Sequence, residues 1–269
     1  MQVYKEFSVL SSRPSKDDLK KIKHHLYGFV SVKKHFSSGE WLKFLKKKIN
    51  ICNKNKSIPI IVGGTGLYFN AITKGISKIP PINQKTRESV RKMYERLGSK
   101  VFYEKLTSLD PKVKNKILAS DTQRVLRAYE VKLKTNKSLY EWASNTKSEF
   151  LNYDIKKFFI DIPREELLEN IEKRTERMFK NKCVKEVKDF LSFDIEKSLS
   201  ANKLIGVKEI SDYLSDIIPL DQTKELIRIK TRQYAKRQNT WSRGHMKNWK
   251  RLYSKDLSTL TKKVLKELS

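Results

Sequence analysis

The stretch Ile58–Phe69 reads IPIIVGGTGLYF, and it decides how the rest of the chain is interpreted. Its first half, Ile58–Val62, is apolar and rich in β-branched residues, which predicts a strand. Three glycines around one threonine follow, and an apolar helical pattern comes after them. A strand that ends in a glycine turn and continues into a helix is typical of α/β proteins, where such a turn can offer free backbone N–H groups to an anion.

The GGTG turn, Gly63–Gly66, matches neither of the common nucleotide-binding loops. A Walker A loop has the form GxxxxGK[ST], and no lysine follows this turn. A dinucleotide-binding loop needs a third glycine in register, which is also missing. The residues alone therefore leave two interpretations open: a tight turn that lets helix and strand pack closely, or an anion site to which Thr65 adds a directed donor.

The composition indicates a folded protein with an anionic partner. The 269 residues include 59 Lys and Arg against 30 Asp and Glu, a formal net charge of +29, and 38% are hydrophobic. Such a basic surface concentrates polyanions, although a lysine-rich composition is also typical of AT-rich genomes. Cys52 and Cys183 are far apart and have no metal-binding spacing, which favours a reducing, cytoplasmic compartment. No run of about 18 apolar residues occurs, so no membrane partner is expected.

Helix signals divide the chain into a core and an insertion. Pro80-Pro81 interrupts the α/β pattern, and helix signals continue from there to about residue 150, with a helix end at Gly98 and a capping residue at Asp121. An apolar run at 158–163 predicts a return to the sheet. We therefore expect residues 1–79 and 151–269 to form an α/β core with C-terminal basic helices. Residues 80–150 are expected to form a helical insertion.

Two basic segments carry candidate RNA-contacting residues. In the run DTQRVLR, Arg124 and Arg127 share a helix face because they are three residues apart. Glutamine and arginine can bind a base edge or a phosphate. In the run TRQYAKRQNTW, basic residues alternate with aromatic rings that can stack on bases. The alternatives are a solvated charged surface for the first run, and for the second a helix that packs Tyr234 and Trp241 inward.

Taken together, the motifs resemble those of one family. The ordered runs are MQVY at 1–4, HHL at 24–26, VGGTGLY at 62–68, DTQRVLR at 121–127, IGVKE at 205–209 and TRQYAKRQNTW at 231–241. In order and spacing they resemble tRNA dimethylallyltransferases over essentially the whole chain. The resemblance implies transfer of a dimethylallyl group from dimethylallyl diphosphate, with Mg²⁺, to N6 of the adenosine 3′ to the anticodon, position 37. It also implies a P-loop NTPase-like α/β core with a parallel sheet, and an all-helical insertion that binds the tRNA anticodon stem-loop.

The resemblance also assigns residues to roles. Thr65 is implied at the reacting centre as the catalytic residue, and the diphosphate is expected at Gly63, Gly64, Thr65 and Gly66. The implied tRNA-binding residues are Met1, Gln2, Thr65, Arg87, Gln123, Arg124, Val125, Leu126, Arg127, Arg232, Lys236 and Arg237. No metal ligand is assigned within this sequence. The protein is expected to act as a monomer in the cytoplasm.

The sequence departs from the family pattern at its start. The family's core begins with a strand and a Walker A loop, followed by an Asp-Ser pair just before the MQVY-like run, and none of these is present. That carboxylate is the expected general base, and that loop stabilises the departing diphosphate. The chain as written is therefore expected to bind tRNA but to transfer little. Three hypotheses stay open: a transferase whose chain continues upstream, an inactive tRNA-binding remnant, and a basic RNA-binding α/β protein of another kind.

Overall fold

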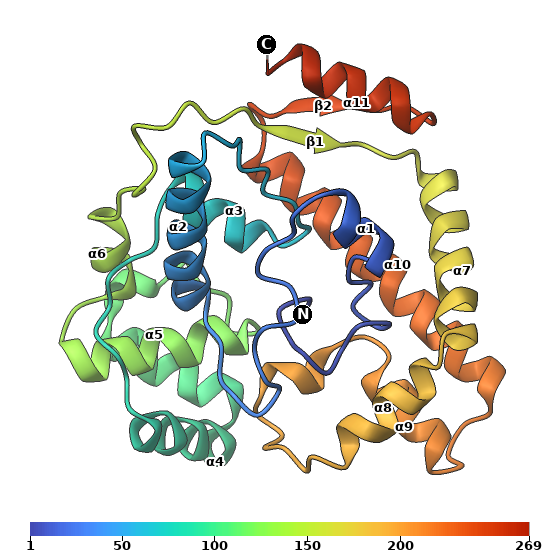
Figure 1. Cartoon of the computed structure of the whole chain (residues 1–269). Coiled ribbons are helices and arrows are strands. Elements are labelled where there is room, and N and C mark those ends of the chain that lie inside the picture. The colour runs from blue at the N-terminus through green and yellow to red at the C-terminus, as the bar shows by residue number, and fades with distance from the viewer. Residues whose placement is uncertain (269) are drawn as a thin grey trace. The chain divides into compact units, whose positions relative to one another are not determined.

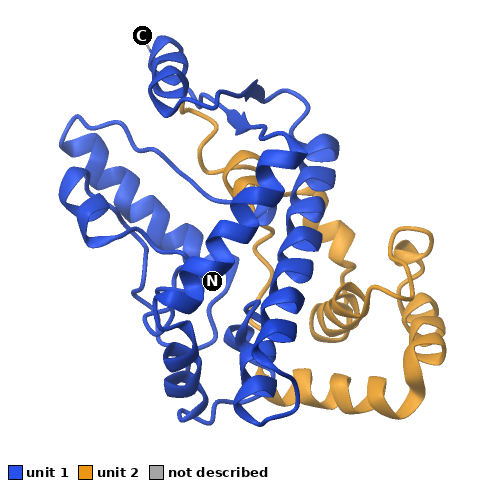
Figure 2. Ribbon diagram, turned by 90° about the vertical axis from the view of Figure 1, so that its right-hand side faces the viewer, with its two compact units in different colours: residues 1–68, 154–269 blue, residues 69–153 orange. Residues whose placement is uncertain are grey.

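The computed structural model describes residues 1–268 and divides into two compact units (Figures 1 and 2). Unit 1 contains Met1–Tyr68 and the chain from Asp154 onward, and unit 2 contains Phe69–Tyr153. Residues 69–79, which the sequence analysis assigned to the core, thus fall in unit 2. The Ser148 hydroxyl donates to the carbonyl of Ile72, and this hydrogen bond ties the segment to the C-terminal end of unit 2.

Unit 1 is mostly helical. Ser37 and Glu40 form a reciprocal capping box at the start of its helix over Ser38–Lys54. Its helices and strands are α1 (Lys16–Lys21), α2 (Ser38–Lys54), β1 (Phe158–Ile160), α7 (Arg164–Lys180), α8 (Cys183–Leu191), η2 (Ser200–Lys203), α9 (Val207–Leu214), α10 (Leu220–His245), β2 (Lys250–Leu252) and α11 (Leu257–Lys266). Helix α3 (Gly66–Thr73) begins in unit 1 and ends in unit 2.

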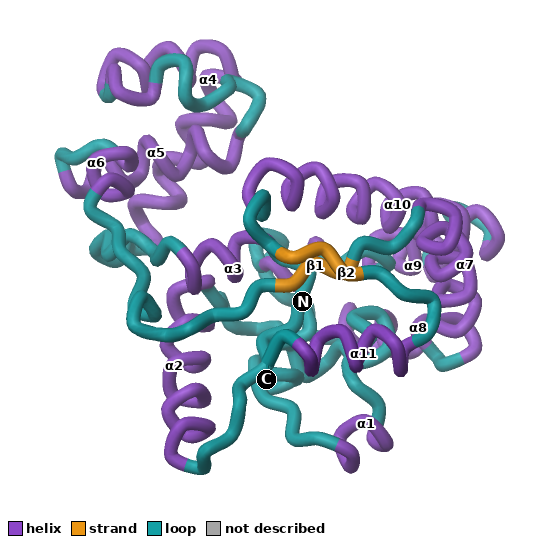
Figure 3. Tube along the Cα trace, turned by 90° about the horizontal axis from the view of Figure 1, so that it is seen from above, coloured by secondary structure: helices purple, strands orange, loops and turns teal. Residues whose placement is uncertain are grey.

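The sheet is small and parallel, and among the described residues it contains only β1 and β2 (Figure 3). Phe158 pairs with Lys250, and Ile160 with Leu252. The Arg251 guanidinium lies 4.7 Å from the centroid of the Phe159 ring and 3.0 Å from the Asp161 carboxylate. The strand predicted from the apolar run at 158–163 is therefore confirmed as β1, and the sheet is parallel as expected.

The strand predicted for Ile58–Val62 was wrong. The segment contains no strand, and none of its backbone groups is hydrogen-bonded to another described residue. Ile58, Ile60 and Val62 are 68%, 67% and 74% exposed. β-branched composition favours an extended backbone, but a strand forms only where a neighbour supplies hydrogen-bond partners, and no described segment lies in that position.

The core of unit 1 joins helices α7–α10 to the loop that contains Leu10. The buried cluster comprises Leu10, Met178, Cys183, Val187, Ile210 and Ile227. Burial, and to a smaller extent the nearby Glu186, raises the pKa of the Cys183 thiol to about 11. This cysteine is therefore a packing residue that stays protonated at neutral pH.

The Leu10 loop is held by two charged side chains. The Glu186 carboxylate of α8 accepts hydrogen bonds from the backbone N–H groups of Ser8, Val9 and Leu10, at 2.6, 2.8 and 2.9 Å, and from the Ser8 hydroxyl at 2.8 Å. Arg174 of α7 donates to the Leu10 carbonyl at 2.9 Å and to the Ser12 hydroxyl at 2.7 Å. These bonds fix a loop that has no regular secondary structure of its own.

Unit 2 is built from helices packed pairwise. Its elements, besides the end of α3, are α4 (Gln84–Leu109), η1 (Pro111–Val113), α5 (Thr122–Thr135) and α6 (Leu139–Ser144). Helix α4 breaks at Gly98, whose φ of 72° and ψ of 168° are not helical, which confirms the predicted helix end. Asp121 caps α5 through the Arg124 N–H, as predicted. The core between α4 and α5 contains Val90, Phe102, Leu106, Val113, Ile117, Val125, Ala128 and Tyr129.

None of the described helices is both long and apolar enough to cross a membrane.

Replacing Glu186 by alanine should destabilise the fold, because it removes the acceptor for three backbone donors. We expect the free energy of unfolding, measured with urea, to fall by about 1–3 kcal/mol, the cost of leaving such groups unsatisfied. Glu169→Ala is the control, because Glu169 pairs with Lys173 on the exposed surface; such pairs contribute about 1 kcal/mol or less. Equal effects of the two substitutions would show that the Glu186 contacts do not hold the loop.

Candidate functional site at the GGTG turn

The GGTG turn lies against helix α10. The Gln238 side-chain amide donates to the Gly64 carbonyl at 2.8 Å, which ties the turn to a residue 174 positions away in the chain. Trp241, one helical turn further along α10, packs its indole ring against Gly66. Two of the sequence motifs, VGGTGLY and TRQYAKRQNTW, therefore meet in one place within unit 1.

Close approach to a rigid ring explains one of the three glycines, Gly66, whereas the atom nearest to Gly64 is the movable end of a side chain. A Cβ atom on Gly64 would lie 2.0 Å from the Gln238 amide nitrogen, and one on Gly66 would lie 2.4 Å from ring atoms of Trp241. Gly63 has no atom within 4 Å of that position, and none of the three has a positive φ. The packing interpretation of the turn is therefore realised, but the packing partner is α10 and not a strand.

Thr65 lies between these two glycines and immediately before α3. The residue is exposed, and its hydroxyl has no hydrogen-bond partner among the described residues. Its carbonyl accepts the Tyr68 N–H at 3.0 Å, which begins the first helical turn. The N–H groups that open a helix have no partner within it and attract anions. The turn thus presents one unengaged hydroxyl beside a helix N-terminus.

Two stacked aromatic pairs lie beside the turn. The Tyr68 ring stacks on Trp41 of α2, with centroids 4.2 Å apart and planes 5° apart. Burial raises the pKa of the Tyr68 hydroxyl, and the nearby Tyr4 raises it further. On the other side, Trp241 stacks on His245 at 4.5 Å. Tyr4 belongs to the MQVY run, so a third motif lies beside the turn.

The first two residues of the chain lie at the surface of unit 1. Met1 is 40% exposed, and the Gln2 side-chain amide donates to the Ser12 carbonyl at 3.0 Å. Ser12 is in the loop that Arg174 and Glu186 hold, so Gln2 is positioned indirectly by α7 and α8.

The candidate RNA-contacting residues of unit 2 divide by burial. Gln123 is exposed, and Arg124 is 71% exposed beside Asp121 at 3.4 Å. Arg127 is 38% exposed and lies 3.5 Å from the carboxylate of Glu130, which is almost fully buried. Arg87 is half-buried, and its Nε has no hydrogen-bond partner among the described residues.

Two residues of the same run have packing positions. Val125 is fully buried in the core of unit 2, and Leu126 packs against that core. Their side chains therefore orient the face that carries Arg124 and Arg127.

The basic residues of α10 lie along its exposed part. Arg232 pairs with Glu225 at 2.5 Å, and the Arg237 guanidinium lies 5.8 Å from the centroid of the Tyr234 ring. Lys236 is exposed and has no partner among the described residues. Tyr234 is 40% exposed, so the inward packing considered for both aromatics holds for Trp241 alone.

The sequence analysis gave inward packing of Trp241 as an alternative, but it predicted neither its contact with the turn nor any role for Gln238. Their spacing of three residues places them on one helix face. Together with glycines that need a close neighbour, that spacing was the available signal.

The described residues do not form a site for Mg²⁺. Magnesium prefers oxygen ligands in octahedral geometry, but no group of three or more His, Cys, Asp or Glu residues within residues 1–268 is arranged so that it could hold a metal ion. The side chains that touch the turn are an amide and an indole. The groups present here therefore supply no carboxylate to the metal that the resemblance implies.

Comparison with protein families identifies the class. Residues 2–245 match the model of the IPP transferase family. The tRNA dimethylallyltransferase of Pelagibacter ubique (strain HTCC1062) is 51% identical over 266 residues, which cover 99% of this chain and 85% of the relative. That of Wolbachia pipientis subsp. Culex pipiens is 39% identical, covering 92% of this chain and 82% of the relative.

Solved structures agree with this result. A tRNA delta(2)-isopentenylpyrophosphate transferase from Staphylococcus epidermidis is 28% identical, with a TM-score of 0.67 that covers all of this chain and 87% of the other. A eukaryotic dimethylallyltransferase, described as acting on tRNA, shares the fold with a TM-score of 0.78 at 23% identity, over 96% of this chain and 66% of the other. The chain belongs to the IPP transferase family.

Replacing Gly66 by alanine should disturb the turn, because the new methyl group overlaps the Trp241 indole. We expect a loss of about 1–3 kcal/mol in the free energy of unfolding, the usual cost of overpacking, and a shift of the tryptophan emission. Gly63→Ala is the matched control, since nothing lies near that position; its effect should stay within about 0.5 kcal/mol. A Gly66→Ala protein as stable as Gly63→Ala would contradict the close packing.

Proposed function

We propose that this chain transfers a dimethylallyl group from dimethylallyl diphosphate to tRNA, at N6 of the adenosine 3′ to the anticodon. Its membership of the IPP transferase family and its 51% identity to a tRNA dimethylallyltransferase support this function. The observation in this structure that carries the proposal is the GGTG turn. It combines an unengaged hydroxyl, free helix N–H groups and a neighbouring basic helix in one exposed place.

The reaction needs an oriented amine and a stabilised leaving group. The N6 nitrogen forms a bond to C1 of the dimethylallyl group, the C1–O bond breaks, the diphosphate leaves with the electron pair, and one N6 proton passes to solvent water. We place the diphosphate at Gly63–Gly66, where the N–H groups at the start of α3 favour negative charge. We assign Thr65 to orient the amine through its hydroxyl. An unactivated hydroxyl is a poor base, so Thr65 is not assigned to remove the N6 proton.

The tRNA is proposed to contact two groups of residues. In this proposal unit 2 is an all-helical insertion that binds tRNA. Its contact residues are Arg87, Gln123, Arg124 and Arg127. Val125 and Leu126 position Arg124 and Arg127 by packing in the core of the unit. In unit 1 the contact residues are Met1, Gln2, Thr65, Arg232, Lys236 and Arg237. Glutamine can form paired hydrogen bonds with a base edge, whereas an exposed lysine such as Lys236 contributes phosphate attraction.

The remaining features of the proposal follow from the family. We propose that unit 1 is related to the P-loop NTPase core, although no Walker A loop occurs in these 269 residues. Mg²⁺ is expected to accompany the diphosphate through that group's own oxygens, a common mode of magnesium binding. We propose a monomer that works in the cytoplasm, where its tRNA substrate is.

Two of the three hypotheses left open by the sequence are not supported. Membership of the IPP transferase family removes the hypothesis of a basic RNA-binding protein of another kind. No observation favours an inactive remnant, and relatives that carry the enzyme name are similar over 85% and 82% of their own length.

Thr65→Val should slow transfer while leaving tRNA bound. Misplacing the reacting amine can cost about 10²-fold in kcat, whereas Thr65→Ser should keep most of the activity because it keeps the hydroxyl. The measurement counts modified adenosine in unmodified tRNA after incubation with dimethylallyl diphosphate and Mg²⁺. Thr261→Val on α11 serves as the control for a threonine elsewhere on the protein. Equal rates for Thr65→Val and the control would remove Thr65 from the reacting centre.

Gln123→Ala and Lys236→Ala should weaken tRNA binding in different ways. Loss of a paired contact from Gln123 should cost about 1–3 kcal/mol with the cognate anticodon stem-loop and little with a scrambled loop. Loss of Lys236 should weaken both loops alike and lower the slope of log affinity against log salt by about 0.7–0.9. Binding measured from low to moderate salt tests both. Identical behaviour of the two variants would refute the division between specificity and charge.

A further inference from the structure

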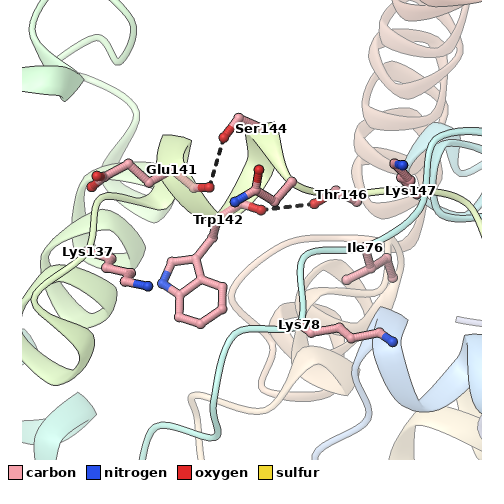
Figure 4. Close-up of a pocket in the computed structure, with 9 residues that line it drawn as sticks. Ile76, Lys78, Lys137, Glu141, Trp142, Ser144, Thr146 and Lys147 are labelled. Carbon is pink, nitrogen blue, oxygen red and sulfur yellow. Dashed lines mark hydrogen bonds between the residues drawn. The ribbon is translucent and has the colours of Figure 1, made fainter.

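A second candidate site lies entirely within unit 2. It is a hollow of about 570 Å³ with Trp142 of α6 at its centre (Figure 4). The segment Ile76–Lys78 forms one wall, and the end of α6 with the loop that follows forms another. The residues that line it are Ile76, Lys78, Lys137, Glu141, Trp142, Ser144, Asn145, Thr146 and Lys147.

The walls of this hollow are tied to each other. The Trp142 ring nitrogen donates to the Thr135 hydroxyl at 3.2 Å, which fixes the indole. The Thr146 hydroxyl donates to the Trp142 carbonyl at 3.1 Å and lies 2.8 Å from the Ser77 hydroxyl, which joins the two walls. Gly75, with a φ of +93°, passes so close to the Lys147 carbonyl that no Cβ fits there. The hollow is therefore formed before any ligand arrives.

The charge of the hollow is positive. Three of its lining residues are the exposed lysines 78, 137 and 147, and the Lys137 ammonium lies 5.6 Å from the centroid of the Trp142 ring. Its single acid, Glu141, is already engaged: it accepts the Ser138 N–H at 2.7 Å and lies 2.9 Å from Lys112. These two contacts lower the pKa of Glu141, the Ser138 hydrogen bond more than Lys112. The lysines thus have no competing partner inside the hollow.

We propose that this hollow binds one nucleotide unit of an RNA. The base stacks on the Trp142 indole, and the adjoining phosphates lie near the lysines. An aromatic face combined with lysine ammonium groups suits a ligand that is both flat and anionic, which describes a nucleotide better than an acidic peptide. The inference rests on the proposed function only in naming tRNA as the RNA, and it adds a contact outside the GGTG turn and outside the run at 121–127.

The test compares affinities of four variants for an unmodified tRNA transcript. Trp142→Ala should weaken binding about 5- to 150-fold, the range for loss of one base–aromatic stack, and Trp142→Phe should stay close to wild type because a ring remains. Lys137→Glu should weaken binding more than Lys100→Glu, which reverses the same charge at an exposed position of α4 in the same unit. Circular dichroism checks that each variant folds; if Trp142→Ala does not, the two lysine variants still decide.

A positional readout and an activity readout complete the test. Ultraviolet cross-linking of wild type to tRNA should leave a nucleotide adduct on the peptide that contains Trp142. Equal affinity of wild type and Trp142→Ala, or of the two lysine variants, overturns the proposal. Transfer of the dimethylallyl group by wild type is measured at saturating tRNA. If wild type binds tRNA through this hollow but transfers nothing, the proposed function fails while this inference stands.

Discussion

The contact between the GGTG turn and helix α10 is the constraint on which the candidate site depends. Gly66 lies so near the Trp241 indole that any side chain would overlap it, and Gly64 is held by the amide of Gln238. This contact holds the turn that carries the exposed Thr65 and precedes α3. Tyr68, one turn later, carries the same constraint to α2 through its stack on Trp41. A reactive surface group is thus positioned by packing and not by its own hydrogen bonds.

The scarce acids of this basic chain are used mainly inside it. Glu186 holds the Leu10 loop, and Glu209 caps α9 at Gly206 while pairing with Lys230. Glu176 accepts contacts from Lys224 and Arg228, which lowers its pKa. With 59 basic residues against 30 acids, many lysines are left without a partner at the surface. That surplus is the physical basis for an RNA-binding surface, because unpaired ammonium groups can replace the counterions of phosphates.

Local signals in the sequence predicted local structure well. The Asp121 cap and the break at Gly98 both occur where the residues indicate. Each depends on a side chain and the backbone within a few positions of it, so no distant information was needed. The apolar run Ile58–Val62 failed for the opposite reason: a strand depends on a partner elsewhere in the chain, which composition does not reveal.

The sequence by itself determined the family, the basic character of the chain and the position of Thr65 between its glycines, because these depend on residue identity and order. Only the tertiary structure decided that the glycines face α10, that Trp241 turns inward while Tyr234 does not, and that Val125 lies in the core beside the exposed Arg124. It alone gathered Trp142 and three lysines around one hollow. Those outcomes require contacts between residues far apart in the chain, and burial is a property of such contacts and not of any single residue.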